Sequence, residues 1–340
     1  RRDDGLKKNC IIICMICLVL VSCGQKKSVK EHGNVSVNNM IDLKNKIKSD
    51  ICDESGQDDY KWGGGIVENS KFIFYTSKNQ LIQINKESHE KIIMKQWKND
   101  NRISLYCTES ELYYIKNMSQ VYSLEIENGN QRLLCDSEML KKAGYRMPEI
   151  WGMQVYSGHI YLELCGLDVI ECGLNGSIGV RIAYDVRSGA FYNHAFFYRQ
   201  RSSNDIYRFD LTSKKENVIR KRKYRERVQY DEIFSQNNKL YYQLEGAIYL
   251  YNESGNDVKV VDDSGMYVHG KDGINYIKTE GKTERLYKLD TNIKQVFSQK
   301  IHEVKTAKDY IEEARIINHM LFYKKDLSGH GNKYEILLLK

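Results

Sequence analysis

The chain lacks the short motifs that identify common enzymes. It has neither the G-x-x-x-x-G-K-[ST] phosphate loop nor the dinucleotide-binding fingerprint. The glycine run at residues 63–65 follows Trp62 and precedes a predicted strand and not a helix. It also has no G-x-S-x-G nucleophile elbow and no calcium-loop spacing. The eight histidines are scattered, without the spacing of metal ligands. We therefore expect a non-enzyme with no catalytic residues, no cofactor and no metal.

Long hydrophobic runs are also absent, except near the start of the chain. Residues 10–21 are apolar, but this run is shorter than the roughly 20 residues of a membrane-spanning helix. Two lysines precede the run and Cys23 follows it, in an order that resembles a bacterial lipoprotein signal. The resemblance predicts a signal peptide at residues 1–22, lipidation of Cys23, and a location at the outer face of the cytoplasmic membrane. An ordinary secretory leader or a buried helix is the alternative.

Proline is nearly absent, with Pro148 as the only one, whereas tyrosine occurs 25 times. Enrichment in aromatic and β-branched residues, with glycine and asparagine at regular intervals, is typical of an all-β fold. The net charge of +7 is a mild bias for a chain of this length. It suits an anionic envelope, and we expect no nucleic-acid partner.

Cysteines are too few and too uneven for a disulfide scaffold. The five that follow Cys23 are Cys52, Cys107, Cys135, Cys165 and Cys172. An odd number cannot all pair within one chain. Cys165 and Cys172 could close a loop of about eight residues, which would contribute about 2.5 kcal/mol. Five free, mostly buried thiols are the alternative.

A repeat of two strands recurs from about residue 63 to the end of the chain. Its clearest element is an alternating strand that leads into a polar turn, at residues 81–85, 121–125, 206–210, 248–252, 286–290 and 333–337. A second strand precedes each of these. The apolar period of two predicts β-strands. Most intervals are about 40 residues, which is the length of a four-stranded β-propeller blade.

One interval is longer, because Tyr122 and Tyr207 are about 85 residues apart, close to two periods. A further strand is predicted at 180–185. However, the roughly 20 residues from Asp185 to Asp205 are too few for the rest of a blade. We therefore expect a six-bladed β-propeller over residues 61–340, with an insertion into the third blade at about 166–204. Seven blades are the alternative.

The segment between the leader and the propeller, residues 23–60, is predicted to be a lipidated tether. Apolar positions between Met40 and Ile51 predict a short helix against the domain. The last predicted blade stops at its third strand, so its edge would stay open. A strand from residues 48–62 could fill this edge and close the ring.

Residues 74–77, Phe-Tyr-Thr-Ser, resemble the Tyr-Trp-Thr-Asp repeat of low-density-lipoprotein-receptor-type propellers. Those propellers are six-bladed. More closely, the chain resembles clostridial lipoproteins whose extracellular part is a receptor-related propeller of unknown function. The tryptophan is missing, and the aspartate is replaced by Ser77, Lys116, Leu164 and Lys278 in different blades. The resemblance covers about residues 60–340. It implies a fold and a location, and it carries no catalytic residues across.

Two surfaces are candidates for binding. The predicted insertion carries aromatic side chains beyond those the repeat needs, and such groups often form contact surfaces. With two neighbours, this set is Trp151, Phe191, Tyr192, Phe196, Phe197, Tyr198 and Arg199. The second surface is a cationic cluster that would contact anionic lipid or wall polymer, at about 1 kcal/mol per cation. It contains Arg220, Lys221, Arg222, Lys223, Arg225 and Arg227. A hairpin packed on its own ring and a solvated connector are the respective alternatives.

These features predict a monomeric, membrane-anchored module outside the cytoplasm that binds a protein, peptide or cell-wall glycan through its propeller loops. A glycan lyase or hydrolase with an axial carboxylate and histidine site is one alternative. A structural assembly platform is another. Acidic, histidine and tyrosine side chains that meet in one axial pocket would favour the enzyme. Flat ring faces without a pocket would favour the platform.

Overall fold

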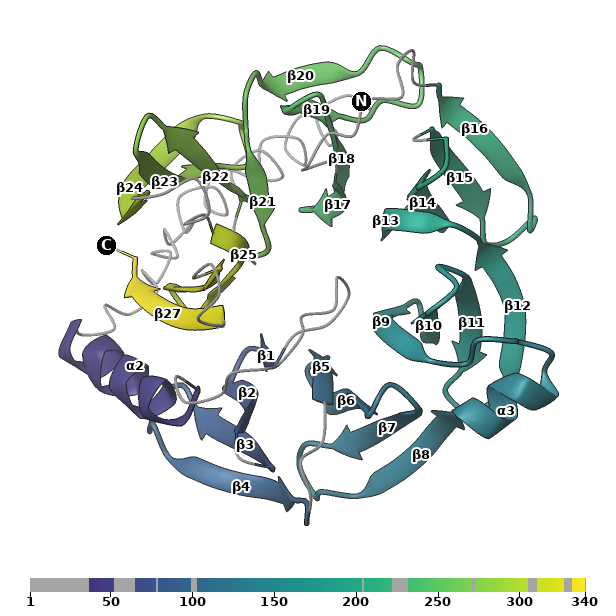
Figure 1. The fold of residues 1–340 in the computed structure, drawn as a ribbon, viewed down its shortest axis with the longest axis horizontal. Coiled ribbons are helices and arrows are strands. Elements are labelled where there is room, and N and C mark those ends of the chain that lie inside the picture. Colours follow the sequence, from purple (N-terminus) through teal and green to yellow (C-terminus); the bar gives the residue numbers. More distant parts are fainter. Residues whose placement is uncertain are drawn as a thin grey trace, which may run out of the picture. The chain divides into compact units, whose positions relative to one another are not determined.

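The computed structural model describes residues 37–51, 65–77, 79–98, 103–203, 205–221, 232–270, 273–304, 311–326 and 332–339. The chain divides into two compact units, residues 1–42 and 43–340. The second unit contains seven antiparallel sheets that surround a common axis (Figure 1). This arrangement confirms the all-β propeller. No helix among the described residues is long and apolar enough to cross a membrane.

Among the described residues, six blades have four strands and the seventh has three. Blade one contains β1 (Ile66–Glu68), β2 (Phe72–Ser77), β3 (Gln80–Asn85) and β4 (Lys91–Gln96). Blade two contains β5 (Ile103–Cys107), β6 (Glu111–Lys116), β7 (Gln120–Glu125) and β8 (Gln131–Asp136). Blade three contains β9 (Ile150–Tyr156), β10 (His159–Leu164), β11 (Val169–Gly173) and β12 (Ile178–Ala183).

Blade four contains β13 (Val186–Tyr192), β14 (Ala195–Gln200), β15 (Ile206–Asp210) and β16 (Glu216–Arg220). Blade five contains β17 (Ile233–Gln236), β18 (Lys239–Leu244), β19 (Ala247–Leu250) and β20 (Val258–Val261). Blade six contains β21 (Met266–Val268), β22 (Ile274–Glu280), β23 (Thr283–Leu289) and β24 (Gln295–Glu303). Blade seven contains β25 (Ile311–Ile317), β26 (Met320–Asp326) and β27 (Asn332–Leu338).

The preferred count of six blades is wrong, and the alternative of seven is confirmed. The supposed insertion at 166–204 consists of β11 to β14, which are regular strands of blades three and four. The six-blade prediction is wrong because it assumes long connections between strands and between blades. Only Tyr184 and Asp185 separate β12 from β13, and Asp185 makes this tight turn with a left-handed φ of 53°. An entire blade therefore fits where the spacing left too little room.

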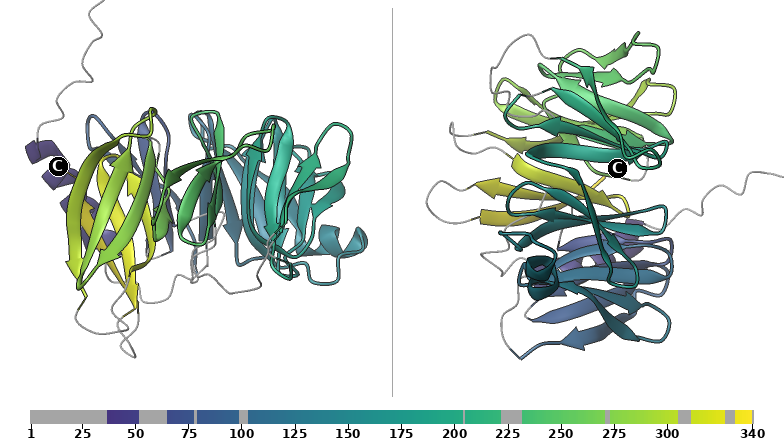
Figure 2. Two further views of the ribbon diagram at one scale, coloured as in Figure 1. Left: turned by 90° about the horizontal axis from the view of Figure 1, so that it is seen from above. Right: turned by 90° about the vertical axis from the view of Figure 1, so that its right-hand side faces the viewer.

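Each blade is an antiparallel meander, so its turns lie at two opposite ends. The turns between first and second strands lie at one end, which we call the hairpin face. The connections from each blade to the next lie at the other end, the connector face. Figure 2 shows the blades edge-on, with loops at both faces. The first strand of every blade lines the axis, and the last lies at the perimeter (Figure 1).

The apolar core lies between blades. In β10, Ile160 and Leu162 belong to the cluster shared with blade two, whereas Tyr161 belongs to the cluster shared with blade four. The alternation follows from the strand period, because successive side chains point to opposite faces of the sheet. A cluster of this kind joins each successive pair from blade one to blade seven. Both faces of a blade are therefore buried, which explains the apolar runs in the sequence.

A pair of tyrosines recurs at one cross-strand position in blades two, four, five and six. Tyrosines of the second and third strands face each other directly and stack, with ring centroids 5.0 to 5.4 Å apart. The pairs are Tyr114 with Tyr122, Tyr198 with Tyr207, Tyr242 with Tyr249 and Tyr276 with Tyr287. Several buried hydroxyls reach a carboxylate, such as that of Tyr323, 2.6 Å from Glu335. Tyrosine suits this position because its ring packs in the apolar interior of the blade, whereas its hydroxyl group reaches the polar edge of the sheet.

The predicted helix near residues 40–51 is confirmed as α2 (Val37–Ile51). Its Leu43 and Ile47 side chains are fully buried. Asp50 accepts a hydrogen bond of 2.5 Å from Tyr75 of β2 and pairs with Lys91 of β4 at 2.6 Å, so this part of the helix covers blade one. Residues 48–51 are thus helical and not a closing strand, and residues 52–62 lie outside the described part of the chain.

Blades seven and one meet through polar contacts. The Arg315 guanidinium of β25 donates to the carbonyl oxygen of Ile66 at 3.0 Å. The backbone amide of Asn318 donates to Glu68 of β1 at 3.3 Å. Within the described residues, no fourth strand from the N-terminal segment joins blade seven. In the described residues, blades seven and one are therefore joined by hydrogen bonds between side chains and backbone groups.

Candidate functional site: the axial cavity

The first strands of all seven blades enclose a cavity of about 450 Å³ on the propeller axis. They contribute mainly the residues toward the hairpin face, since each strand ends there. The polar lining residues are Glu68, Tyr106, Gln154, Tyr156, Ser235, Gln236, Tyr267, His269 and Arg315. Aliphatic and aromatic side chains such as Leu105 and Phe191 complete the wall. A concave site with a mainly apolar wall and a few polar groups is typical of small-ligand binding.

Arg315 is the cation among the described residues that line this cavity, and a backbone contact positions its strand. Its β25 segment runs beside the end of blade six, where the amide of Ile316 donates to the carbonyl oxygen of His269 at 2.7 Å. One guanidinium nitrogen is used by the Ile66 carbonyl, as described above. Among the described residues, Arg315 forms no ion pair with a carboxylate.

His269 follows β21 and faces the water of the cavity. Its ring lies edge-on to that of Tyr267, with centroids 4.9 Å apart, and Tyr267 in turn stacks on Phe234 at 3.7 Å. The surrounding blades limit hydration of the imidazolium, and the charge of Arg315 is close, so both effects lower the pKa of His269. The imidazole is therefore neutral near pH 7.

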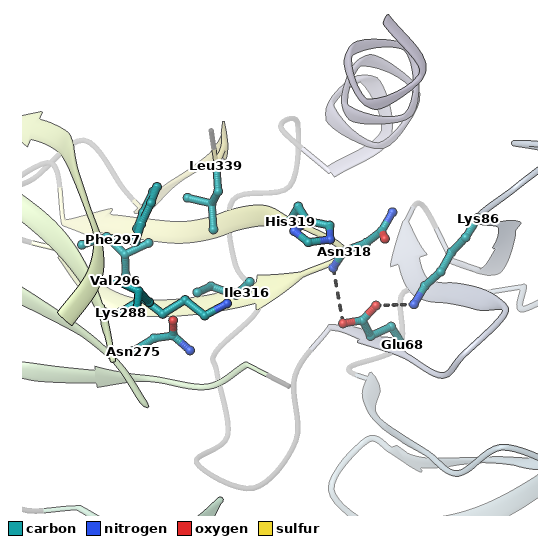
Figure 3. Close-up of a pocket in the computed structure, with 11 residues that line it drawn as sticks. Glu68, Lys86, Asn275, Lys288, Val296, Phe297, Ile316, Asn318, His319 and Leu339 are labelled. Atoms are coloured by element: carbon teal, nitrogen blue, oxygen red, sulfur yellow. Dashed lines mark hydrogen bonds and ion pairs between the residues drawn. The ribbon is translucent and has the colours of Figure 1, made fainter. Parts of the chain in front are cut away.

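Glu68 is the acidic residue of the described lining, and its carboxylate is engaged on both oxygens. One oxygen accepts from the Asn318 amide and the other pairs with Lys86. Glu68 also borders a second cavity of about 410 Å³ between blades six, seven and one (Figure 3). There Lys288 and Asn275 lie across the opening from the Glu68–Lys86 pair.

The axial residues can bind, but the described chain does not assemble a familiar catalytic set. Within the part of the chain that the structure describes, no group of three or more His, Cys, Asp or Glu side chains lies close enough to hold a metal. The carboxylate of Glu68 is tied to a lysine, and no second acid lines the described cavity. A neutral His269 beside a cation could accept a proton, which is the feature that keeps an enzymatic role open.

The aromatic residues predicted as a binding surface lie mostly in the core. Phe196, Phe197 and Tyr198 are on β14, the second strand of blade four, and are at most 1% exposed. Their burial follows from the missing insertion, because these residues form an ordinary blade. Phe191 differs from these three residues in its location. It is buried against Tyr156, but it also borders the axial cavity. Tyr192 is half-buried at the end of β13.

Arg199 and Trp151, the other two predicted binding residues, are also held inside the ring. Arg199 is fully buried and donates to the carbonyl oxygen of Gln243 at 2.6 Å, so it links blades four and five. Trp151 is half-buried in β9, and its indole nitrogen has no hydrogen-bond partner among the described residues. Neither lines the axial cavity.

The predicted cationic cluster begins at the end of β16. Arg220 forms a two-pronged ion pair with Asp257, at 2.5 and 2.6 Å, and lies over the ring of Tyr251. Lys221 is exposed. The other four cations, Arg222, Lys223, Arg225 and Arg227, lie outside the described residues. Contact of this segment with an anionic surface therefore stays a prediction.

The proposed Cys165–Cys172 disulfide is not formed, and both thiols are free. Cys165 lies in the turn after β10, whereas Cys172 is opposite Ile160 near the other end of the same hairpin. The strand length separates them. Cys172 instead packs in the same buried cluster as Cys135 of β8, from the neighbouring blade.

Sequence reasoning did not find Arg315, His269 or Ser235 as a group. They come from blades seven, six and five, and nothing in their local sequences distinguishes them from other strand residues. One signal was available: each lies on or directly after a first strand, and first strands line a propeller axis. The correct blade boundaries were needed before that signal could be used.

Comparison with known proteins supports the fold and does not identify a family. No protein-family model matches the sequence, and no curated protein matches it. Among solved structures, the chain is similar to PorZ, an essential surface component of the type-IX secretion system of Porphyromonas gingivalis, with TM-score 0.54 and 14% identity over 84% of this chain. The match spans 38% of the PorZ chain.

Two further structures have similar folds. A chain of the mitotic checkpoint complex matches with TM-score 0.51 and 9% identity, over 85% of this chain and 94% of that one. An oligogalacturonate lyase from Vibrio parahaemolyticus matches with TM-score 0.50 and 11% identity, over 83% and 90%. At these identities the likeness concerns the propeller fold alone.

Proposed function

We propose that this protein is a membrane-anchored binding module outside the cytoplasm, and that its axial cavity holds the ligand. The observation that carries the proposal is the convergence of seven first strands on one cavity with a cation, neutral hydrogen-bonding groups and aromatic rings. Propellers use such an axis because every blade can place a side chain there. The leader and Cys23 support the anchored location, through the sequence pattern alone.

Binding is preferred to catalysis because the described cavity offers one acid, which is already paired, and no cluster of three or more possible metal ligands lies among the described residues. A structural platform would need no internal cavity, so the cavity favours a ligand. The protein, peptide or glycan partner expected from the sequence would reach the opening at the hairpin face. The docking of a large partner could bring a small part of it into the cavity.

The test is to block the cavity without disturbing the ring. Ser235 is exposed and lines the cavity, so Ser235→Trp places a large indole in it. Ser254→Trp is the matched control, because Ser254 is equally exposed but lies in the turn before β20. The full chain in detergent would be screened against envelope glycans and peptides. Loss of captured ligands in S235W but not in S254W is expected. Identical binding by both variants would refute the cavity as the site.

A second candidate, a glycan lyase, is favoured by the resemblance to an oligogalacturonate lyase and by the neutral imidazole of His269. It predicts formation of unsaturated uronate from polyuronate, with and without added divalent metal. Product formation that His269→Gln abolishes would favour the lyase over the binding module. Binding without any product favours the module.

A further inference from the structure

The charges that border the axial cavity do not balance among the described residues. Glu68 is neutralised by Lys86, with the remaining oxygen held by a backbone amide. His269 is neutral near pH 7. Arg315 is then left as a cation whose hydrogen bond goes to a neutral carbonyl. An enclosed cation without a counter-charge favours an anionic ligand, since Coulomb attraction is stronger there than in bulk water.

The guanidinium group narrows the choice of anion. It is planar and has five N–H donors, which match the two oxygens of a carboxylate. One nitrogen of Arg315 contacts Ile66, and the side chain is only half-buried, so other donors stay accessible from the cavity. A carboxylate could therefore pair with Arg315 without breaking the contact that joins blades seven and one.

The other residues of the cavity wall suit a sugar ring, which carries several hydroxyl groups. Ser235 and Gln154 offer neutral hydroxyl and amide groups, and the tyrosines Tyr106 and Tyr156 offer aromatic surface for the apolar faces of a sugar. The volume of about 450 Å³ lies in the range of small-ligand pockets. We propose that the cavity binds an acidic saccharide, of the hexuronate class, whose carboxylate pairs with Arg315. This inference rests on the proposed binding function.

The test measures binding of galacturonate and glucuronate to the full chain by titration calorimetry, with galactose and glucose as neutral counterparts. The acids should bind at least about tenfold more tightly than the neutral sugars. Arg315→Gln should remove this preference, and Arg315→Lys should restore part of it. Arg181→Gln is the control, because Arg181 is 55% exposed on β12, away from the cavity.

The outcomes separate this inference from the proposed function. Equal binding of acidic and neutral sugars, or an acid preference that R315Q retains, would overturn the inference. If S235W still abolished binding in that case, the binding function would stand. Tighter binding of a peptide with a free C-terminal carboxylate than of either hexuronate would overturn the saccharide class. Absence of hexuronate binding would overturn it as well.

A second inference rests on two buried thiols in the contact between blades two and three. Cys135 of β8 and Cys172 of β11 are fully buried in the same apolar cluster, where each thiol donates to a backbone carbonyl oxygen 3.7 Å away. The neighbouring Cys172 thiol and burial raise the pKa of Cys135. Two buried thiols that pack in one cluster across adjacent sheets can be bridged where their Cβ atoms approach to about 4.5 Å. We propose that they form an interblade disulfide when the chain folds in an oxidising compartment.

The chemistry needs an electron acceptor, and a disulfide donor such as oxidised glutathione supplies it. The two thiols lose two protons and two electrons, an S–S bond forms between Cys135 and Cys172, and the donor is reduced to two thiols. Exchange would take place during folding, because both sulfurs are inaccessible once the blades have packed.

The test is refolding of the full chain with oxidised glutathione, followed by peptide mapping without reductant. A linked Cys135–Cys172 peptide pair is expected, and a rise in melting temperature that reductant reverses. Cys135→Ser and Cys172→Ser should both lose the rise, whereas Cys165→Ser should keep it. Linkage of Cys172 to Cys165, or two unlinked peptides from correctly refolded chain, would overturn the proposal.

Discussion

Asp257 is the best place to test whether polar contacts hold the perimeter of the ring. This carboxylate is 8% exposed and accepts four hydrogen bonds. Two come from Arg220, at 2.5 and 2.6 Å, one from the Tyr242 hydroxyl at 2.6 Å and one from the Asn252 amide at 2.8 Å. The group therefore ties β16 of blade four to β18 and the turn before β20 in blade five.

Asp257→Asn keeps the shape and one acceptor oxygen but turns an amide N–H₂ toward donors. A hydrogen bond to a charged group contributes about 1.5–3 kcal/mol, and the losses are not additive. Arg220 is 27% exposed, so water compensates part of its loss. We expect the free energy of unfolding to fall by about 3 kcal/mol, and the melting temperature by about 6–10 °C. Urea unfolding at pH 7 would measure the former.

Asp262→Asn is the matched control, because Asp262 is 91% exposed and its pair with Lys259 is a surface contact. It should change stability by less than about 0.5 kcal/mol. A loss of under about 1 kcal/mol in D257N would refute the assignment of Asp257 as an interblade anchor. It would also support the prediction from the sequence that Arg220 belongs to the cluster that contacts an anionic surface.

The pH dependence provides an independent check. Burial opposes ionisation of Asp257, but the hydrogen bonds from Arg220, Tyr242 and the Asn252 amide outweigh it, so the pKa of Asp257 is lowered. A lowered folded-state pKa gives stability that is fully present above the unfolded value, about 3.9, and is lost as pH falls through the folded value. The difference between wild type and D257N should therefore be constant near neutrality and shrink below about pH 4.

Three further substitutions test other parts of the fold. Arg199→Ala should lower the free energy of unfolding by about 3 kcal/mol, because it leaves the buried Gln243 carbonyl without its donor, and denaturant titration would show it. Gly265→Ala should cost more than about 2 kcal/mol, since a Cβ there would lie 2.3 Å from the Ile277 oxygen at φ +57°; Gly281→Ala, with φ +62° and open space, should cost about 1 kcal/mol. Ile47→Ala should cost about 2–4 kcal/mol if α2 is part of the folded unit, whereas exposed Lys48→Ala should be near neutral by thermal melting.

Much of the fold could be read from the sequence, because strand patterns are local. The tyrosine and aliphatic positions at 121–125, 206–210, 248–252 and 286–290 fall on β7, β15, β19 and β23. The helix near Met40 followed from its apolar spacing. Blade count was harder, because it depends on connections, and a two-residue connection at Tyr184 and Asp185 leaves no composition signal.

The candidate site could not be read in the same way. Aromatic residues on β14 stood out in the sequence, yet their place in the second strand of a blade buries them between neighbours. Arg199 stood out as a charged residue, yet its guanidinium group donates a hydrogen bond to the Gln243 carbonyl oxygen of the next blade. The side chains that stand out in the sequence thus belong to the core. There the large rings fill space between blades, and the long cation donates a hydrogen bond to a backbone carbonyl.

The sequence by itself determined most strands, their turns and the propeller class, since each depends on residues close together in the chain. The lipoprotein-like leader stays a prediction from the same kind of local pattern. Only the tertiary structure decided that seven blades close the ring, that Cys172 packs in the same cluster as Cys135, and that Arg315 and His269 face one cavity with Ser235. These groups lie in different blades and meet because closure brings every first strand to the same axis. No local pattern records a meeting that ring closure creates.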